Sequence, residues 1–102
     1  MKAVRLSEQT QTIINGTAHD IFGSDVAVKV FGSRLNDQVR GGDIDLLIES
    51  ESQIDQSRYK SLQLVARLQM LLGDQSIDVL VIDPQTDKQA IHSEAQRTGV
   101  SL

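Results

Sequence analysis

Two apolar strands joined by a polar loop are encoded by residues 26–48, VAVKVFGSRLNDQVRGGDIDLLI. The first strand is rich in β-branched residues and ends abruptly at Gly32-Ser33, and the second begins at Asp43 with the series DIDLLI. The nine residues that separate Ser33 from Asp43 form a polar run that is too short for a full-length helix. We interpret the strand, the Gly-Ser turn, the short loop and the Asp-x-Asp strand as one structural unit.

The flanking sequence adds two helices to this unit. Apolar residues recur at helical spacing from Ser7 to Phe22, with Ser7 as the expected cap and Gly23 as the stop. A second helix is expected to end at Gly73, and its apolar positions are Tyr59, Leu62, Val65, Leu68 and Leu72.

The C-terminal part completes the predicted architecture. An apolar run at 77–82 predicts a third strand, and Thr86 or Asp87 is expected to cap a last helix that stops at Gly99. The order helix, strand, strand, helix, strand, helix predicts an α+β fold in which helices pack on one face of a small mixed β-sheet.

Length and composition limit the classes of protein that the chain can represent. Its 102 residues predict a single domain, 1–102, with one modest core, and the first residues lack the apolar run of a signal peptide, so we expect a cytoplasmic protein. The absence of cysteine excludes disulfides and thiolate chemistry, and His19 and His92 do not have the spacing of zinc ligands. The net charge of −4 argues against polymeric nucleic acid as a substrate, and no apolar run is long enough for a membrane span.

Three aspartates can form a metal site. Asp43 and Asp45 share one face of their strand, because successive side chains of a strand alternate between faces. Two adjacent carboxylates raise each other's pKa unless a cation compensates for their charge. Asp78 opens the third strand and joins the same cluster if that strand pairs with the second. Three oxygen ligands suit Mg²⁺ or Mn²⁺, which keep open positions for water and nucleotide phosphates.

Gly32 and Ser33 can bind the phosphates of such a nucleotide. A glycine at a strand end permits close approach of the backbone, and the serine offers a hydroxyl and backbone N–H groups. Arg40 in the loop either reaches the phosphates or remains a solvated arginine. A lone Gly-Ser is usually a turn and a lone Asp-x-Asp is often a solvated face, but their combined order and spacing predict a nucleotide site.

The series Val30-Phe31-Gly32-Ser33, nine residues, Asp43-Ile44-Asp45-Leu46-Leu47-Ile48 and the later Asp78 resembles the DNA polymerase β-like nucleotidyltransferase superfamily. More narrowly, residues 10–102 resemble the minimal nucleotidyltransferases (MNT). The resemblance implies that Gly32 and Ser33 bind the triphosphate, that Asp43 and Asp45 hold metal ions, and that Asp78 completes one metal site and helps to deprotonate the attacking hydroxyl. The chain departs from the common MNT pattern at Leu35-Asn36-Asp37, which follows Arg34.

The resemblance also implies an activity and a partner. It implies transfer of AMP from Mg-ATP to a tyrosine hydroxyl of a helical HEPN-type protein, with this chain as the antitoxin of a toxin–antitoxin pair. Two alternatives stay open: transfer to a small hydroxylated molecule, held by another chain or a dimer mate, and a non-catalytic module that occludes its partner. If helices cover only the opposite face, Leu47, Leu80 and Ile82 are partly uncovered beside the aspartates, and we expect a partner protein there.

Overall fold

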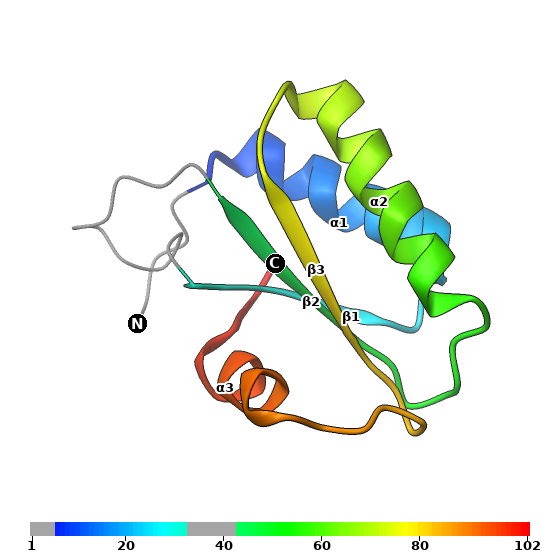
Figure 1. Cartoon of the computed structure of the whole chain (residues 1–102). Helices are drawn as coiled ribbons and strands as arrows, with labels where there is room; N and C mark the ends of the chain where they lie inside the picture. Colours follow the sequence, from blue (N-terminus) through cyan, green and yellow to red (C-terminus); the bar gives the residue numbers. More distant parts are fainter. Residues whose placement is uncertain (1–5, 33–42) are drawn as a thin grey trace.

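Three helices and four strands make up the part of the chain that the computed structural model describes, residues 6–32 and 43–102 (Figure 1). In chain order they are α1 (Glu8–Phe22), β1 (Ala27–Phe31), β2 (Ile44–Glu49), α2 (Ser57–Leu72), β3 (Ile77–Ile82), α3 (Ala90–Thr98) and β4 (Val100–Ser101). The predicted α+β class with a small mixed sheet is confirmed. Across these two ranges, no helix is both long enough and apolar enough to cross a membrane.

The sheet has the strand order β3-β2-β1-β4. β2 pairs in parallel with β3 and antiparallel with β1, while β4 pairs antiparallel with the other edge of β1. The short β4 is absent from the sequence prediction, because two residues are too few to carry a periodic pattern. β2 therefore occupies an interior position in the sheet, between the strand that ends at Gly32 and the strand that carries Asp78.

The main core lies between one face of the sheet and the helices α1 and α2, which run side by side in Figure 1. Alternate residues of the strands face these helices, as the period of two requires. Val28, Val30, Ile44, Leu46 and Ile48 pack there with Ile14, Ala18, Leu64 and Leu68. Asp45 and Asp78, one residue out of phase with this apolar series, therefore lie on the other face.

The ends of α1 agree with the prediction, and the start of α3 does not. The Ser7 hydroxyl accepts a hydrogen bond from the Thr10 backbone N–H at 3.1 Å, and α1 stops at Gly23. α3 is capped by Gln89, whose backbone N–H donates to the ring of His92 at 3.0 Å. Thr86 is not the cap, because its hydroxyl accepts from the Asp83 backbone N–H within the turn after β3. Asp87 also lies before the true cap.

The face that carries the aspartates is more covered than predicted. Leu47 and Ile82 are buried there in a small cluster with Ala95 of α3, and Leu80 packs against its edge. α1 and α2 thus lie on the predicted face, whereas α3 covers part of the other one (Figure 1). The expectation of an uncovered Leu47 and Ile82 was wrong, because the chain after β3 crosses to this face before β4 pairs with β1.

α2 buries part of the stripe that its sequence indicated: Leu68 is in the core, and Val65 and Leu72 pack against the core. Leu64 and Leu68 are its fully buried residues, while Tyr59 and Leu62 are exposed. The buried stripe is turned toward Leu64, which the prediction omitted, and away from Tyr59 and Leu62, which it included.

Glu49 ties α3 to the sheet. Its Oε1 atom lies 2.7 Å from Lys29 Nζ on the neighbouring strand, and its Oε2 accepts from Gln96 Nε2 at 2.9 Å. Burial raises the pKa of the Glu49 carboxyl, but the hydrogen bonds from Lys29 and Gln96 and the charges of Lys29 and Lys88 outweigh it. The pKa of Glu49 is therefore held below its ordinary value of 4.5.

The substitution Glu49→Gln is expected to destabilise the protein at pH 7 by about 1 kcal/mol, which corresponds to a fall in Tm of about 4–8 °C. An acid whose pKa is depressed by folding contributes stability above its unfolded pKa, and this contribution is lost as pH falls through the folded pKa. The difference from the wild type should therefore shrink below the ordinary value of 4.5. Thermal melts from pH 3 to pH 8 test this, with Glu51→Gln at an exposed position as the control. Equal differences at all pH values would contradict the role of the ionised carboxylate.

Candidate functional site

Two of the predicted acidic residues are neighbours across adjacent strands. Asp45 of β2 stands in register with Asp78 of the parallel strand β3. Their side chains point to the same face, and the two carboxyl groups share a hydrogen bond. Asp43 lies two residues before Asp45, just ahead of β2, where its side chain is exposed. The strand pairing that the sequence analysis required of Asp78 is thus present.

Gly32 lies against Asp45 from the other side. Phe31, the last residue of β1, is in register with Asp45, so Gly32 follows at the point where β1 leaves the sheet. The backbone of Gly32 has φ +79°, which disfavours any residue with a Cβ atom. A Cβ atom added here would overlap Asp45 Oδ2 and lie 3.2 Å from Asp45 Cγ. Glycine is therefore needed both for the turn and for the space that the Asp45 carboxylate occupies.

Among the three aspartates, the carboxyl of Asp45 has a raised pKa. Burial raises the pKa of its carboxyl above the ordinary value of 3.8, and the negative charges of Asp78 and Asp43 raise it further. The hydrogen bond that the protonated Asp45 carboxyl donates to Asp78 acts in the same direction. Three carboxylates thus lie near one another, an arrangement to which a divalent cation binds favourably.

The residues fit a Mg²⁺ or Mn²⁺ site by their chemistry. All three side chains offer carboxylate oxygens, the ligands that these ions prefer. In the described ranges no three acidic or imidazole groups already surround one point. Asp78 already contacts the Asp45 carboxyl, and Asp43 and Asp78 are both exposed, so a metal ion can approach the group from solvent. The role of Asp43, Asp45 and Asp78 as metal ligands stays a prediction.

Two predicted phosphate-binding residues, Ser33 and Arg40, lie outside the described residues. The structure therefore brings together Gly32, Asp43, Asp45 and Asp78 at one end of the sheet, where β1 ends and where β2 and β3 begin. The assignment of Ser33 and Arg40 to the triphosphate stays a prediction from the sequence.

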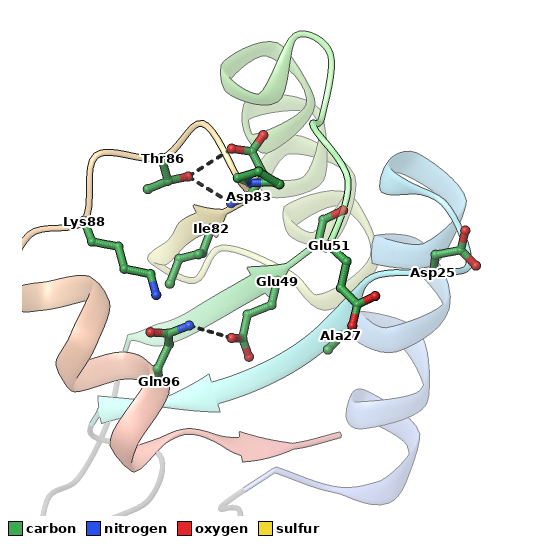
Figure 2. A pocket seen from close by; sticks show the side chains of 11 residues that line it. Asp25, Ala27, Glu49, Glu51, Ile82, Asp83, Thr86, Lys88 and Gln96 are labelled. Carbon is green, nitrogen blue, oxygen red and sulfur yellow. Dashed lines mark hydrogen bonds between the residues drawn. The ribbon is translucent and has the colours of Figure 1, made fainter.

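A separate pocket of about 580 Å³ lies at the opposite end of the sheet (Figure 2). Sequence reasoning did not find it, because it is bounded by segments far apart in the chain, including the end of β2 and part of α3. Its carboxylates come from Asp25, Glu49, Glu51 and Asp83, with Lys88 as the one cation among the described lining residues.

The wall of this pocket is held by Asp83 at the end of β3. The backbone N–H of Ile54 donates to Asp83 Oδ2 at 2.9 Å, and the N–H of Gln85 donates to Oδ1 at 2.9 Å. The hydrogen bond from Ile54 lowers the pKa of the Asp83 carboxyl, and those from Gln85 and Thr86 lower it further. The role of Asp83 is therefore structural, because its hydrogen bonds join the loop before α2 to the turn after β3 (Figure 2).

Comparison with known proteins places the fold in a class. The sequence matches no known protein family and no curated protein. Among solved structures, it is similar to a chain of a crystal structure from Shewanella oneidensis, with a TM-score of 0.65 and 13% identity over 95% of this chain and 71% of the other.

A second similar chain belongs to a re-refined structure of a tri-AMPylated Shewanella oneidensis HEPN toxin in complex with MNT antitoxin. There the TM-score is 0.64 and the identity 16%, over 94% of this chain and 71% of the other. At these identities the likeness establishes the fold alone. The protein thus has a small α+β fold of the MNT type.

Proposed function

We propose that this protein is a metal-dependent nucleotidyltransferase that moves AMP from ATP to a tyrosine hydroxyl of a HEPN-type partner, and so acts as an antitoxin. One observation carries the proposal: Asp45 lies between Gly32 and Asp78, its carboxylate fills the space left by the missing Cβ atom of Gly32, and burial and the charges of Asp78 and Asp43 raise its pKa. The MNT-type fold gives further support, because a similar chain occurs in a structure that contains an AMPylated toxin.

The proposed reaction is an in-line displacement at the α-phosphorus of ATP. The Asp78 carboxylate accepts the proton of the tyrosine hydroxyl, whose oxygen forms a new bond to the α-phosphorus. The bond from that phosphorus to the oxygen that bridges it to the β-phosphate breaks, and pyrophosphate leaves. Asp43 and Asp45 would hold Mg²⁺, which when bound supplies positive charge to the phosphates. Gly32 keeps its backbone close to the nucleotide without displacing Asp45.

The test follows AMP onto the partner. The purified protein is mixed with Mg²⁺ and ATP labelled at the α-phosphate, alone and with a HEPN-type protein from the same organism. We expect the partner to gain the mass of one or more AMP units, and we expect EDTA to abolish the gain because the carboxylates alone cannot neutralise the phosphates.

Each remaining outcome points to another function. A stable complex without transfer would replace the proposal with an occluding module that has no catalysis. Transfer to a small hydroxylated compound in the absence of the partner would replace the protein acceptor with a small molecule. The label together with a size-exclusion assay of complex formation therefore distinguishes all three functions.

A further inference from the structure

α2 carries a second apolar surface on the side that faces away from the core. Tyr59, Leu62, Ala66 and Met70 follow one another at intervals of three or four residues, so they form one stripe along the helix. The stripe lies opposite Leu64 and Leu68, which are fully buried. The side chains of Tyr59, Leu62 and Met70 are 59%, 64% and 85% exposed. We call these four residues the outer stripe.

Exposed apolar side chains are concentrated on this helix. Five large apolar residues are exposed in the described ranges, and four of them, Tyr59, Leu62, Met70 and Leu71, belong to α2. Single exposed apolar residues are ordinary, but a row of them on one element is typical of a surface that contacts another molecule. A hollow beside Tyr59 and Leu62 at the start of the helix, also lined by Gln56 and Arg58, is suited to a protruding side chain.

The border of the outer stripe is basic in an acidic protein. From Ser57 to Leu72 the sequence holds Arg58, Lys60 and Arg67 and no acidic residue, whereas the whole chain has a net charge of −4. Arg58 stands on one side of the stripe and Arg67 on the other. Arg67 also pairs with Asp20 of α1, with Arg67 Nη1 at 2.9 Å from Asp20 Oδ2, so Asp20 offsets part of its charge and Arg58 and Lys60 carry most of the basic character.

We propose that the outer stripe docks a helix of a partner protein, one whose own apolar stripe is bordered by Asp and Glu side chains. The proposal rests on the partner of the proposed function, and it adds the surface through which that partner is held. Charge complementarity favours this occupant, because basic rims on one side of an apolar contact select acidic rims on the other.

The same charges argue against two other occupants. A second copy packed stripe to stripe would bring two basic helices together without any acidic side chain from either α2. An anionic membrane would attract Arg58 but repel a protein of net charge −4. A partner protein with an acidic border meets neither penalty.

Docking at the outer stripe leaves the candidate nucleotide site free. α2 packs on the face of the sheet that carries Leu46 and Ile48, whereas Asp45 and Asp78 point to the other face. A partner held on α2 therefore does not cover Asp45. The tyrosine that receives AMP must then lie on a part of the partner that extends past the edge of the sheet to the other face.

The test compares matched substitutions of exposed apolar residues. The double variant Leu62→Glu, Met70→Glu places acids in the stripe, and Ile91→Glu on α3 is the control because Ile91 is 52% exposed on another element. Binding to a HEPN-type protein from the same organism is measured by calorimetry, after thermal melts show that each variant is folded. We expect the double variant to bind about 30-fold more weakly, the effect of losing a principal contact, and the control to bind like the wild type.

Several results would overturn the docking surface. Equal affinity of the double variant and the wild type would do so while leaving the partner of the proposed function intact. A wild-type dimer that Leu62→Glu dissociates in ultracentrifugation would assign the stripe to a second copy. Stripe-dependent flotation with phosphatidylglycerol vesicles would assign it to a membrane. If the wild type binds no HEPN-type protein at all, the partner of the proposed function fails, and the docking surface fails with it.

Discussion

Replacing Asp45 with Asn is expected to slow AMP transfer by about 10²–10³-fold, the usual effect of removing one group that stabilises transition-state charge. Asn keeps the size of the side chain but removes the negative charge that would hold the metal ion. The raised pKa of Asp45 comes first from burial and then from Asp78 and Asp43, so its ionised form is the form that the fold disfavours. The same substitution should therefore raise the Tm of the metal-free protein at pH 7.

The sign of this stability effect follows from proton binding. An acid whose pKa is raised by folding holds its proton more tightly in the folded state, so its ionisation at higher pH weakens the fold. The advantage of Asp45→Asn should be largest at neutral pH and vanish below the ordinary pKa of 3.8. Added Mg²⁺ should stabilise the wild type more than the variant, since only binding to the folded state raises Tm.

Transfer assays and melts in EDTA and in Mg²⁺ give the two readouts together. Asp25→Asn is the matched control, because Asp25 is an exposed aspartate beside the pocket at the opposite end of the sheet. It should change neither the transfer rate nor the response to Mg²⁺. A variant at Asp45 that transfers AMP at the wild-type rate, or that is less stable than the wild type in EDTA, would refute the assignment of this carboxylate.

Local patterns were sufficient to predict most of the fold. The β-branched alternation before Gly32, the apolar run after Asp43 and the Ser7 cap are signals contained within a few residues. β4 lacked such a signal, because its two residues form a strand only by pairing with Lys29 and Val30. The position of α3 was missed for a similar reason, since the contact of Ala95 with Leu47 joins residues that are distant in the chain.

The candidate site was predictable to the extent that its geometry is local. The alternation of a strand places Asp43 and Asp45 on one face, whatever the surroundings. Whether Asp78 joins them depends on which strand pairs with β2, which the sequence does not fix. In the structure β3 is that strand, and Asp78 stands in register with Asp45. The Asp45 carboxylate occupies space that a Cβ atom on residue 32 would fill. No pattern in the sequence reveals this contact. That contact appears only when β1 and β2 are placed side by side.

The substitution Gly32→Ala is expected to slow AMP transfer by about 10²-fold, because a displacement of about 1 Å in a catalytic group has an effect of that size. The new Cβ atom would overlap Asp45 Oδ2, the free end of a side chain that can swing away. Swinging relieves the overlap but moves the carboxylate from its place beside Asp78. The backbone at φ +79° adds a loss of stability of about 1–2 kcal/mol.

Gly73→Ala separates these two effects. Gly73 has φ +94°, a backbone conformation that alanine also disfavours, yet a Cβ atom there would meet no heavy atom within 4 Å. The two alanine variants should lose similar stability in thermal melts, while only Gly32→Ala loses AMP transfer. Equal activity in both variants would mean that Asp45 tolerates displacement, and its carboxylate would then not be the group that holds the metal ion. Equal losses of activity would instead trace the effect to backbone strain alone, and the close approach of Gly32 to Asp45 would have no part in the reaction.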